Sequence, residues 1–440
     1  MVSVEQMEEV NQALDCAEAL VPRSVSGSGA GREGRPLRLV VCGATGYLGK
    51  FVCRIAKERG LYVRALVRAA GRLEDSDDLC DEVFVGQATQ PQTIKGLCDN
   101  MDVIFSSIGI RSAARTPTVW EVDYQANVNL VDEAVGAGVQ HCVFVSVLDG
   151  DKHRNKVGHV VEARERVVDH LKVLEKAKKI TYTILRPTGF FNDMAELFSM
   201  AREGQAWIVG DGSKKVNPIH GHDLATLAID VVENFENHIG EQIPVGGPDT
   251  YTFKELVELA LQIAERPANT KISSLPVWVL SLASKITAPF NKNLSGFIKF
   301  FSMMAEVDMA ANPIGNHHIA DFFARLHVGQ IVNEEGWYEV DVHARGRVTL
   351  TYDVTEKDFG KEFIWTFRSK RKDIALEAKF VDDDSGEEIV LTPPTIFLRS
   401  HRKDLSHRVP IDRVGTFSVT LDNEYSMFYK KTVSYLLRVV

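Results

Sequence analysis

Long hydrophobic runs are missing from this sequence of 440 residues. No stretch without charged residues reaches the roughly 18 apolar residues that a membrane-spanning helix requires. The N-terminal segment lacks the apolar core of a secretory signal, and Glu5, Glu8 and Glu9 make it too acidic for an ordinary organelle transit peptide. We therefore expect a cytoplasmic protein that spans no membrane.

Cysteine and positive charge are also scarce. The net charge is −9 because 60 acidic residues outnumber 51 basic ones, which argues against a general nucleic-acid binder, whose affinity depends on neutralising phosphates. The cysteines lie in the first third of the chain, without the spacing of metal ligands. We expect reduced core thiols rather than disulfides, and no metal site; the thiols are those of Cys16, Cys42, Cys53, Cys80, Cys98 and Cys142.

A glycine-rich turn between an apolar run and a helical pattern is the most informative stretch of the chain. Gly43 permits the turn, Gly46 lets the backbone approach a pyrophosphate, and Gly49 lets the following helix pack on the strand. The helix N-terminus adds N–H groups and partial positive charge. A plain strand-to-helix turn is the alternative. The context favours a dinucleotide bound to Gly43-Ala44-Thr45-Gly46-Tyr47-Leu48-Gly49.

Strand-like and helical patterns alternate from residue 37 to about residue 150. This rhythm predicts an α/β fold with a Rossmann-type, doubly wound parallel sheet, in which ligands bind at the carboxyl ends of the strands. We expect residues 1–36 to be a flexible extension and residues 37–325 to form the nucleotide-binding domain with its substrate side. The expected strands are Leu39–Cys42, Tyr62–Val67, Glu82–Val85, Val103–Ser106 and Cys142–Ser146.

The charge that follows the second expected strand predicts which dinucleotide binds. An NAD site usually has an acidic residue about 20 positions past the glycine loop, but this region offers Arg64 and Arg68 instead, with no carboxylate before Glu74. A guanidinium there would pair with a 2′-phosphate, so we expect NADP(H). Arg68 is favoured because Arg64 lies within the expected strand, and a solvated arginine is the alternative.

Residues beyond 151 contain three further features of interest. A sixth strand, Tyr182–Pro187, ends where a substrate would lie. In the segment 218–225, Asp223 is predicted to cap a helix, and His220 and His222 to be structural histidines rather than metal ligands. The segment Leu275–Met304 is the most apolar of the chain, and its lysines favour a buried or interfacial helix pair, with a lid over an apolar substrate as the alternative.

Beyond a boundary near 324–335 the hydrophobic period changes to two. Short strand-like runs separated by turns predict an all-β sandwich over residues 331–440. This part has neither cysteine nor a catalytic motif, so we interpret it as a binding module. Two basic clusters, 368–372 and 399–403, would suit an anionic membrane surface, with solvated loops as the alternative.

Residues 37–325 resemble an atypical short-chain dehydrogenase/reductase of the NAD(P)H-binding, divinyl-chlorophyllide-reductase-like kind. Besides the glycine loop, the matching segments are 122–127, 185–191 and 211–212. The resemblance implies a catalytic serine at Ser146 and cofactor contacts from Ser107, Arg186 and Pro187. The tyrosine and lysine usual in this family fall at Val160 and Arg164, so Arg164 would hold the ribose without acting as a proton shuttle.

The C-terminal part resembles a GOLD domain, the β-sandwich found in vesicle-traffic and lipid-transfer proteins. The matching segments are 415–426 and 430–435. Such a module would dock a protein partner or an anionic membrane, making this a peripheral membrane protein in the second case.

Two functions remain open from the sequence. The first is an NADP(H)-dependent oxidoreductase that reduces a small apolar, conjugated or carbonyl substrate, because cofactor and rim residues are present. The second is a non-catalytic adaptor that senses NADP(H) and uses its GOLD domain to bind a partner, because the usual tyrosine and lysine are absent. We favour the enzyme.

Overall fold

The computed structural model describes residues 35–69, 79–110, 115–157, 159–327, 331–332, 338–342, 345–369, 374–383, 385–397, 405–424 and 431–439. The chain divides into two compact units, Met1–Ala324 and Arg325–Val440. Residues 1–34, which contain most of the expected flexible extension, lie outside the described part. Among the described helices, none has both the length and the apolar composition needed to cross a bilayer.

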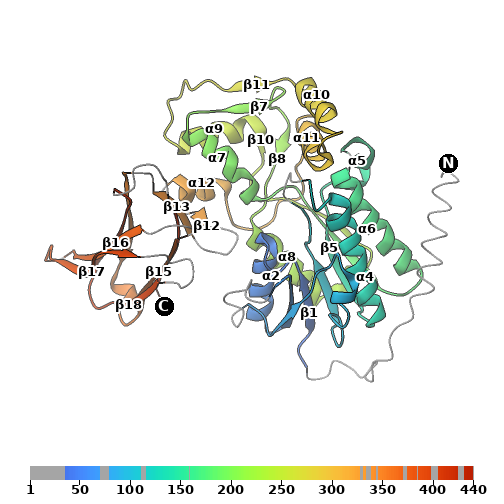
Figure 1. Cartoon of the computed structure of the whole chain (residues 1–440), viewed down its shortest axis with the longest axis horizontal. Helices are drawn as coiled ribbons and strands as arrows, with labels where there is room; N and C mark the ends of the chain where they lie inside the picture. The colour runs from blue at the N-terminus through green and yellow to red at the C-terminus, as the bar shows by residue number, and fades with distance from the viewer. Residues whose placement is uncertain are drawn as a thin grey trace. The chain divides into compact units, whose positions relative to one another are not determined.

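The first unit is built on a seven-stranded parallel sheet with strand order β3-β2-β1-β4-β5-β6-β9 (Figure 1). The Rossmann-type fold predicted from the sequence is therefore confirmed. Its strands are β1 (Arg38–Cys42), β2 (Tyr62–Val67), β3 (Glu82–Val85), β4 (Val103–Ser106), β5 (His141–Val145), β6 (Thr181–Pro187) and β9 (Gln242–Val245).

Helices cover both faces of this sheet because the central strands are apolar on both sides. Leu39 and Val41 of β1 pack with helices α2 (Tyr47–Glu58) and α8 (Gly221–Glu233), whereas Val40 faces the opposite cluster. The opposite layer consists of α4 (Ala126–Gly136), which follows the π-helical segment η2 (Trp120–Gln125), and α6 (His159–Lys176). Such burial on both faces is what a parallel sheet requires.

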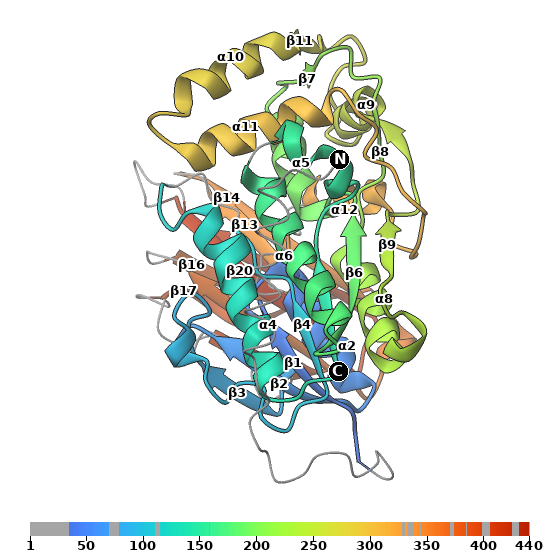
Figure 2. The same cartoon turned by 90° about the vertical axis from the view of Figure 1, so that its right-hand side faces the viewer.

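Shorter elements lie beyond the carboxyl ends of β6 and β9 (Figure 2). Two small sheets pair β10 with β8 and β11 with β7, and the helix pair expected over 275–304 is present as α10 and α11. The elements are α5 (Gly150–Val157), α7 (Ala195–Arg202), β7 (Trp207–Val209), β8 (Lys215–Val216), β10 (Tyr251–Thr252), α9 (Phe253–Ile263), β11 (Ser273–Leu275), α10 (Val277–Thr287), α11 (Lys292–Met304) and α12 (Ile319–His327).

The second unit consists of two antiparallel sheets with orders β12-β13-β20-β15-β18 and β14-β19-β16-β17. Phe363 of one sheet stacks on Phe417 of the other with ring centroids 4.2 Å apart, so the sheets enclose a common core, as expected for a sandwich. The side chains of the two basic clusters, 368–372 and 399–403, lie outside the described part. The strands are β12 (Ile331–Val332), β13 (Tyr338–Val342), β14 (Arg347–Val354), β15 (Glu362–Ser369), β16 (Ile374–Asp382), β17 (Glu388–Phe397), β18 (Leu405–Pro410), β19 (Gly415–Asp422) and β20 (Lys431–Val439).

The cysteines of the described part are reduced and buried, as the sequence predicted, while Cys16 lies outside it. Burial raises the pKa of the Cys42 thiol well above its usual value and that of Cys142 to about 12. Because only the thiolate reacts, we expect these thiols to react with Ellman's reagent only after the chain is unfolded in guanidinium chloride. A Cys16→Ser variant isolates the described thiols, and rapid reaction of that native variant would contradict the expectation.

Candidate cofactor site and neighbouring polar clusters

The glycine loop joins β1 to α2 in a tightly closed turn. Gly43 has a positive φ of 94°, and an added Cβ would lie 2.8 Å from the hydroxyl oxygen of Ser107. The N–H of Gly46 donates to the carbonyl oxygen of Gly43 over 2.9 Å. A Cβ on Gly49 would overlap that same carbonyl. The loop therefore brings Ser107 against the predicted cofactor segment. At its two ends, Gly43 and Gly49, there is space for glycine and for no larger residue.

Helix α2 begins at Tyr47 with Gly46 as its N-cap, and glycine supplies no side-chain cap. A helix that begins at a glycine turn is the arrangement that dinucleotide sites use to bind a pyrophosphate. The Tyr47 hydroxyl accepts the N–H of Gly221 over 3.0 Å, and its ring makes edge contacts with Phe190 and His220. Tyr47 thus connects the glycine loop to the predicted substrate rim.

The two arginines of the second strand have different environments. Arg64 is buried within β2, where its guanidinium pairs with Glu82 at 2.8 Å and donates to the carbonyl oxygen of Leu97. Arg68 follows β2 and is exposed, and it forms no ion pair with any residue in the described ranges. Since β2 lies next to β1 in the sheet, Arg68 follows the strand beside the glycine loop, and its contact with a phosphate stays a prediction.

Ser146 belongs to a buried polar cluster at the carboxyl ends of β5 and β6. Its hydroxyl donates to Glu165 over 2.8 Å, and Arg186 holds both carboxylate oxygens of Glu165 at 2.8 and 2.9 Å. Arg186 also donates to Gln242 and to the carbonyl oxygen of Val147. Side-chain exposure is only 5% for Arg186 and 2% for Glu165. The predicted residues Ser146 and Arg186 therefore meet through Glu165, a residue to which the sequence assigned no role.

Arg164, which is partly buried, forms a second ion pair beside the first with a buried carboxylate. Its guanidinium lies 2.9 Å from Asp123 and donates to the carbonyl oxygen of Val145 over 2.7 Å. It packs directly on Gly109, in the loop after β4, where a Cβ would overlap it. Burial raises the pKa of Asp123, although the Arg164 charge and the N–H of Ile110 oppose that shift. Arg164 and Ser146 thus share one strand end.

The position at which the family has its tyrosine holds Val160 in this chain, and helix α11 packs against it. Val160 lies on α6 and is partly buried, and a Cβ on Gly296 of α11 would be 3.2 Å from its side chain. The Ser146 hydroxyl is directed at a carboxylate that is already paired. By this alignment an apolar side chain, Val160, takes the place of the phenol, and the guanidinium of Arg164 takes the place of the amine.

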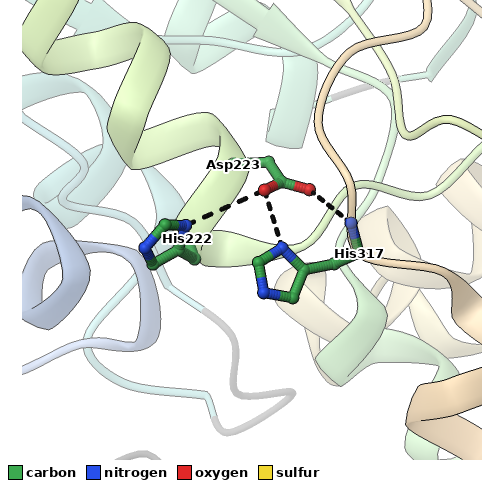
Figure 3. Close-up of side chains that lie close together, drawn as sticks. All are labelled: His222, Asp223 and His317. Atoms are coloured by element: carbon green, nitrogen blue, oxygen red, sulfur yellow. Dashed lines mark hydrogen bonds and ion pairs between the residues drawn. The ribbon is translucent and has the colours of Figure 1, made fainter.

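A histidine–aspartate cluster lies at the N-terminus of α8 (Figure 3). Asp223 is not the helix cap that the sequence predicted, because His220 is the N-cap and accepts the N–H of His222. Asp223 instead accepts the ring Nδ1–H of His317 over 2.7 Å and the backbone N–H of the same residue over 3.2 Å. The partner is 94 positions away along the chain, so no local pattern could reveal it.

This cluster has the donor set of a divalent-cation site without requiring one. Ligand atoms of His222, Asp223 and His317 all lie within 4.8 Å of one another, and two histidines with one carboxylate suit several transition metals. However, the bond between His317 and Asp223 already satisfies the buried carboxylate. The sequence assigned structural roles to His220 and His222, which stay predictions; the ring of His220 stacks on that of His317 at 4.2 Å.

Comparison with known proteins gives one family model and several distant relatives. Residues 43–235 match the family model described as NAD(P)H-binding. Divinyl chlorophyllide a 8-vinyl-reductase of Cucumis sativus is 24% identical over 318 residues, 68% of this chain and 72% of the relative. Photosystem II assembly factor Ycf39 of Guillardia theta is 26% identical over 275 residues, 61% of this chain and 81% of the relative.

Residues 43–235 are therefore similar to NAD(P)H-binding domains, and their relatives include a divinyl chlorophyllide reductase and a photosystem II assembly factor. Two solved structures share the fold of this part of the chain. A nucleoside-diphosphate-sugar epimerase of Staphylococcus aureus superposes with a TM-score of 0.53 at 17% identity, covering 66% of this chain and all of the epimerase. A triphenylmethane reductase of Citrobacter sp. gives 0.52 at 18% identity, covering 66% of this chain and 99% of the reductase.

The proteins that this part of the chain resembles are both reductases and assembly factors. The domain type therefore does not by itself distinguish the two functions left open by the sequence. What the site can do depends on its own residues: a glycine loop between β1 and α2, an exposed guanidinium after β2, and two ion pairs at the ends of β5 and β6.

Proposed function

We propose that this chain is an NADP(H)-dependent oxidoreductase that reduces a small apolar, conjugated or carbonyl substrate. The observation that carries the proposal is the presence of both a complete glycine loop and an exposed Arg68. Arg64, the other arginine of this region, is already paired with Glu82 and so leaves Arg68 as the candidate. A guanidinium in that place pairs with the 2′-phosphate that distinguishes NADP(H) from NAD(H).

The residues that face the cofactor would act mainly by positioning. Bound NADPH supplies a hydride. Residues 43–49 and Ser107 would hold the diphosphate, and Arg164, fixed by Asp123, would hold the ribose with its remaining N–H groups. Pro187 and the rim at Phe190 would direct the substrate toward the cofactor. Holding the two reactants in contact supplies a large part of the rate, which suits a substrate that already contains an activated double bond.

Calorimetry on the whole chain with NADPH and NADH tests the cofactor half of the proposal. We expect NADPH to bind at least about tenfold more tightly than NADH, since a guanidinium–phosphate pair contributes roughly 1.5–3 kcal/mol. Arg68→Ala should remove that preference and leave NADH affinity unchanged. Arg54→Ala, on the exposed face of α2, is the matched control. Equal affinities in the native chain would contradict the assignment.

Turnover is tested separately by following NADPH oxidation with a panel of quinones, enones and conjugated macrocycles. Oxidation that depends on the substrate supports an enzyme, whereas tight cofactor binding without oxidation across the panel would overturn it. The second outcome would favour a non-catalytic, NADP(H)-sensing adaptor. Two observations support that alternative. The Ser146 hydroxyl donates its hydrogen bond to Glu165. Val160 stands where the family has its usual proton donor.

For the second unit we propose a GOLD module that docks a protein partner or an anionic membrane surface. Its two facing antiparallel sheets and the segments 415–426 and 430–435 support this assignment. In the adaptor alternative, binding of the partner must change NADPH affinity, and NADPH must change partner affinity by the same factor. Identical NADPH affinities with and without the partner would exclude coupling.

A further inference from the structure

Helix α10 presents large apolar side chains to solvent rather than to the core. Trp278, Leu282 and Ile286 recur every four residues on one face of the helix, and each is exposed. Phe290, in the turn that leads to α11, is 69% exposed. Monomeric soluble proteins rarely leave such a continuous apolar ridge uncovered, so this face is built to contact something.

The contact between α10 and α11 has the opposite character. Ser284 and Ser295 are both buried, and each hydroxyl donates to the other residue's backbone carbonyl oxygen, over 3.1 and 2.9 Å. Gly296, the next residue of α11, is also buried. A helical hairpin in water normally buries its large apolar residues and exposes its small polar ones. This hairpin reverses that order, as helix pairs in contact with lipid do.

The charged residues around this apolar ridge indicate what kind of partner it contacts. From Arg266 to Ala305 the sequence contains no aspartate or glutamate, although the whole chain has a net charge of −9. Lys285 lies on the exposed face of α10, and Lys292 and Lys299 are exposed on α11. None of these three lysines forms an ion pair with a residue that the structure describes. A local excess of cations around apolar side chains is what an anionic lipid surface attracts.

We propose that the α10–α11 hairpin, residues 277–304, docks the first unit on an anionic lipid bilayer. Trp278, Leu282, Ile286 and Phe290 would enter the boundary between headgroups and acyl chains, and the lysines would extend to the headgroups. Neither helix is long enough to span a bilayer, so the hairpin lies in the interface. This membrane contact is distinct from any contact made by the second unit.

The placement of the hairpin also relates the membrane to the candidate site. Asn293 of α11 accepts the N–H of Val119 over 3.2 Å and donates to the carbonyl oxygen of Pro117 over 3.0 Å. Gly296 packs against Val160. In Figure 2, α10 runs across the end of the first unit with α11 beside it. A bilayer under α10 would therefore adjoin the side of the domain on which an apolar substrate is expected.

Flotation of the full-length chain with liposomes tests the proposal. We expect binding to vesicles of phosphatidylcholine with about a third phosphatidylglycerol, and little binding to phosphatidylcholine alone. Trp278→Ser/Leu282→Ser should reduce the partition coefficient by about tenfold or more, because two large apolar side chains no longer enter the interface. Lys285→Gln/Lys292→Gln/Lys299→Gln should lower binding and weaken its dependence on salt.

Three controls separate this surface from the alternatives. Val85→Ser and Val390→Ser remove equally exposed apolar side chains elsewhere and should bind as the native chain does. Arg371→Gln/Lys372→Gln/Arg402→Gln/Lys403→Gln removes the basic clusters of the second unit. Circular dichroism and urea unfolding of each hairpin variant check that the chain is folded, so failure of the native chain to bind NADPH would count against the proposed function without affecting this test.

Several outcomes would overturn the proposal. No flotation with anionic vesicles would do so, as would flotation that is lost in the second-unit variant but retained in both hairpin variants. A native dimer in analytical ultracentrifugation that becomes monomeric in Trp278→Ser/Leu282→Ser would show that a second copy of the chain covers the ridge. Quenching of tryptophan fluorescence by brominated lipid, reduced in a Trp278→Phe variant that still floats, would directly support insertion.

Discussion

Replacement of Glu165 by alanine should lower the free energy of unfolding by about 3–5 kcal/mol. The substitution leaves the Arg186 guanidinium charged, 5% exposed and without the carboxylate that holds it in two places. It also removes the acceptor of the Ser146 hydroxyl. A buried charge without a partner bears the full cost of desolvation. The decrease in the free energy of unfolding should therefore far exceed that caused by a surface substitution. Urea unfolding followed by circular dichroism measures it.

Two further variants show whether the ion pair or the hydroxyl causes this loss. Ser146→Ala removes only a hydroxyl and should cost about 1 kcal/mol. Glu165→Leu/Arg186→Met replaces both charges by apolar side chains and should be markedly more stable than Glu165→Ala, as found when buried pairs are removed together. If Glu165→Ala were as stable as Ser146→Ala, the buried pair would not hold the ends of β5 and β6 together.

Substitution of the glycines in the loop should separate cofactor binding from folding. A methyl group on Gly46 would lie 3.2 Å from the carbonyl oxygen of Gly43, a contact that a small shift relieves, and its φ of −85° suits alanine. We expect Gly46→Ala to fold with a loss below about 1 kcal/mol, while NADPH affinity falls by about a hundredfold because the methyl group occupies the place of the diphosphate.

Gly49→Ala should behave differently, because its methyl group would overlap the carbonyl oxygen of Gly43 and approach the backbone of Ala44 within 2.9 Å. Neither neighbour is a flexible side chain, so α2 must move away from β1, and we expect a loss of about 3 kcal/mol or more in stability together with the loss of NADPH binding. Urea unfolding and calorimetry are the measurements, with Arg54→Ala as the control on the same helix. Unchanged NADPH affinity in Gly46→Ala would place the diphosphate elsewhere.

The sequence predicted the nucleotide-binding half of the fold well because its signals are local. Apolar runs of four to six residues gave the strands, and the spacing of Gly43, Gly46 and Gly49 gave the turn between β1 and α2. The choice of Arg68 over Arg64 also came from local position, since a residue inside a strand is directed into neighbouring packing. The structure agrees with that reasoning by pairing Arg64 with Glu82.

Polar networks were not predictable in the same way. The sequence identified Ser146, Arg164 and Arg186 but not the carboxylates, Glu165 and Asp123, that hold them. A clue existed, because Glu165 follows Arg164 directly on one helix and both face the same strand end. The error at Asp223 has the same origin: a helix start with an acidic residue resembles a cap, whereas its true partner, His317, comes from a distant segment.

The sequence by itself determined the α/β sheet, the glycine turn and the position of the cation after β2, since these follow from the periodicity and conformational freedom of adjacent residues. Only the tertiary structure decided which carboxylate faces which arginine, and that the most apolar segment of the chain exposes Trp278 while burying Ser284. Composition gives the number of apolar side chains in a helix. Which face contacts protein depends on the neighbours that the fold brings to it, and those neighbours are distant in the sequence.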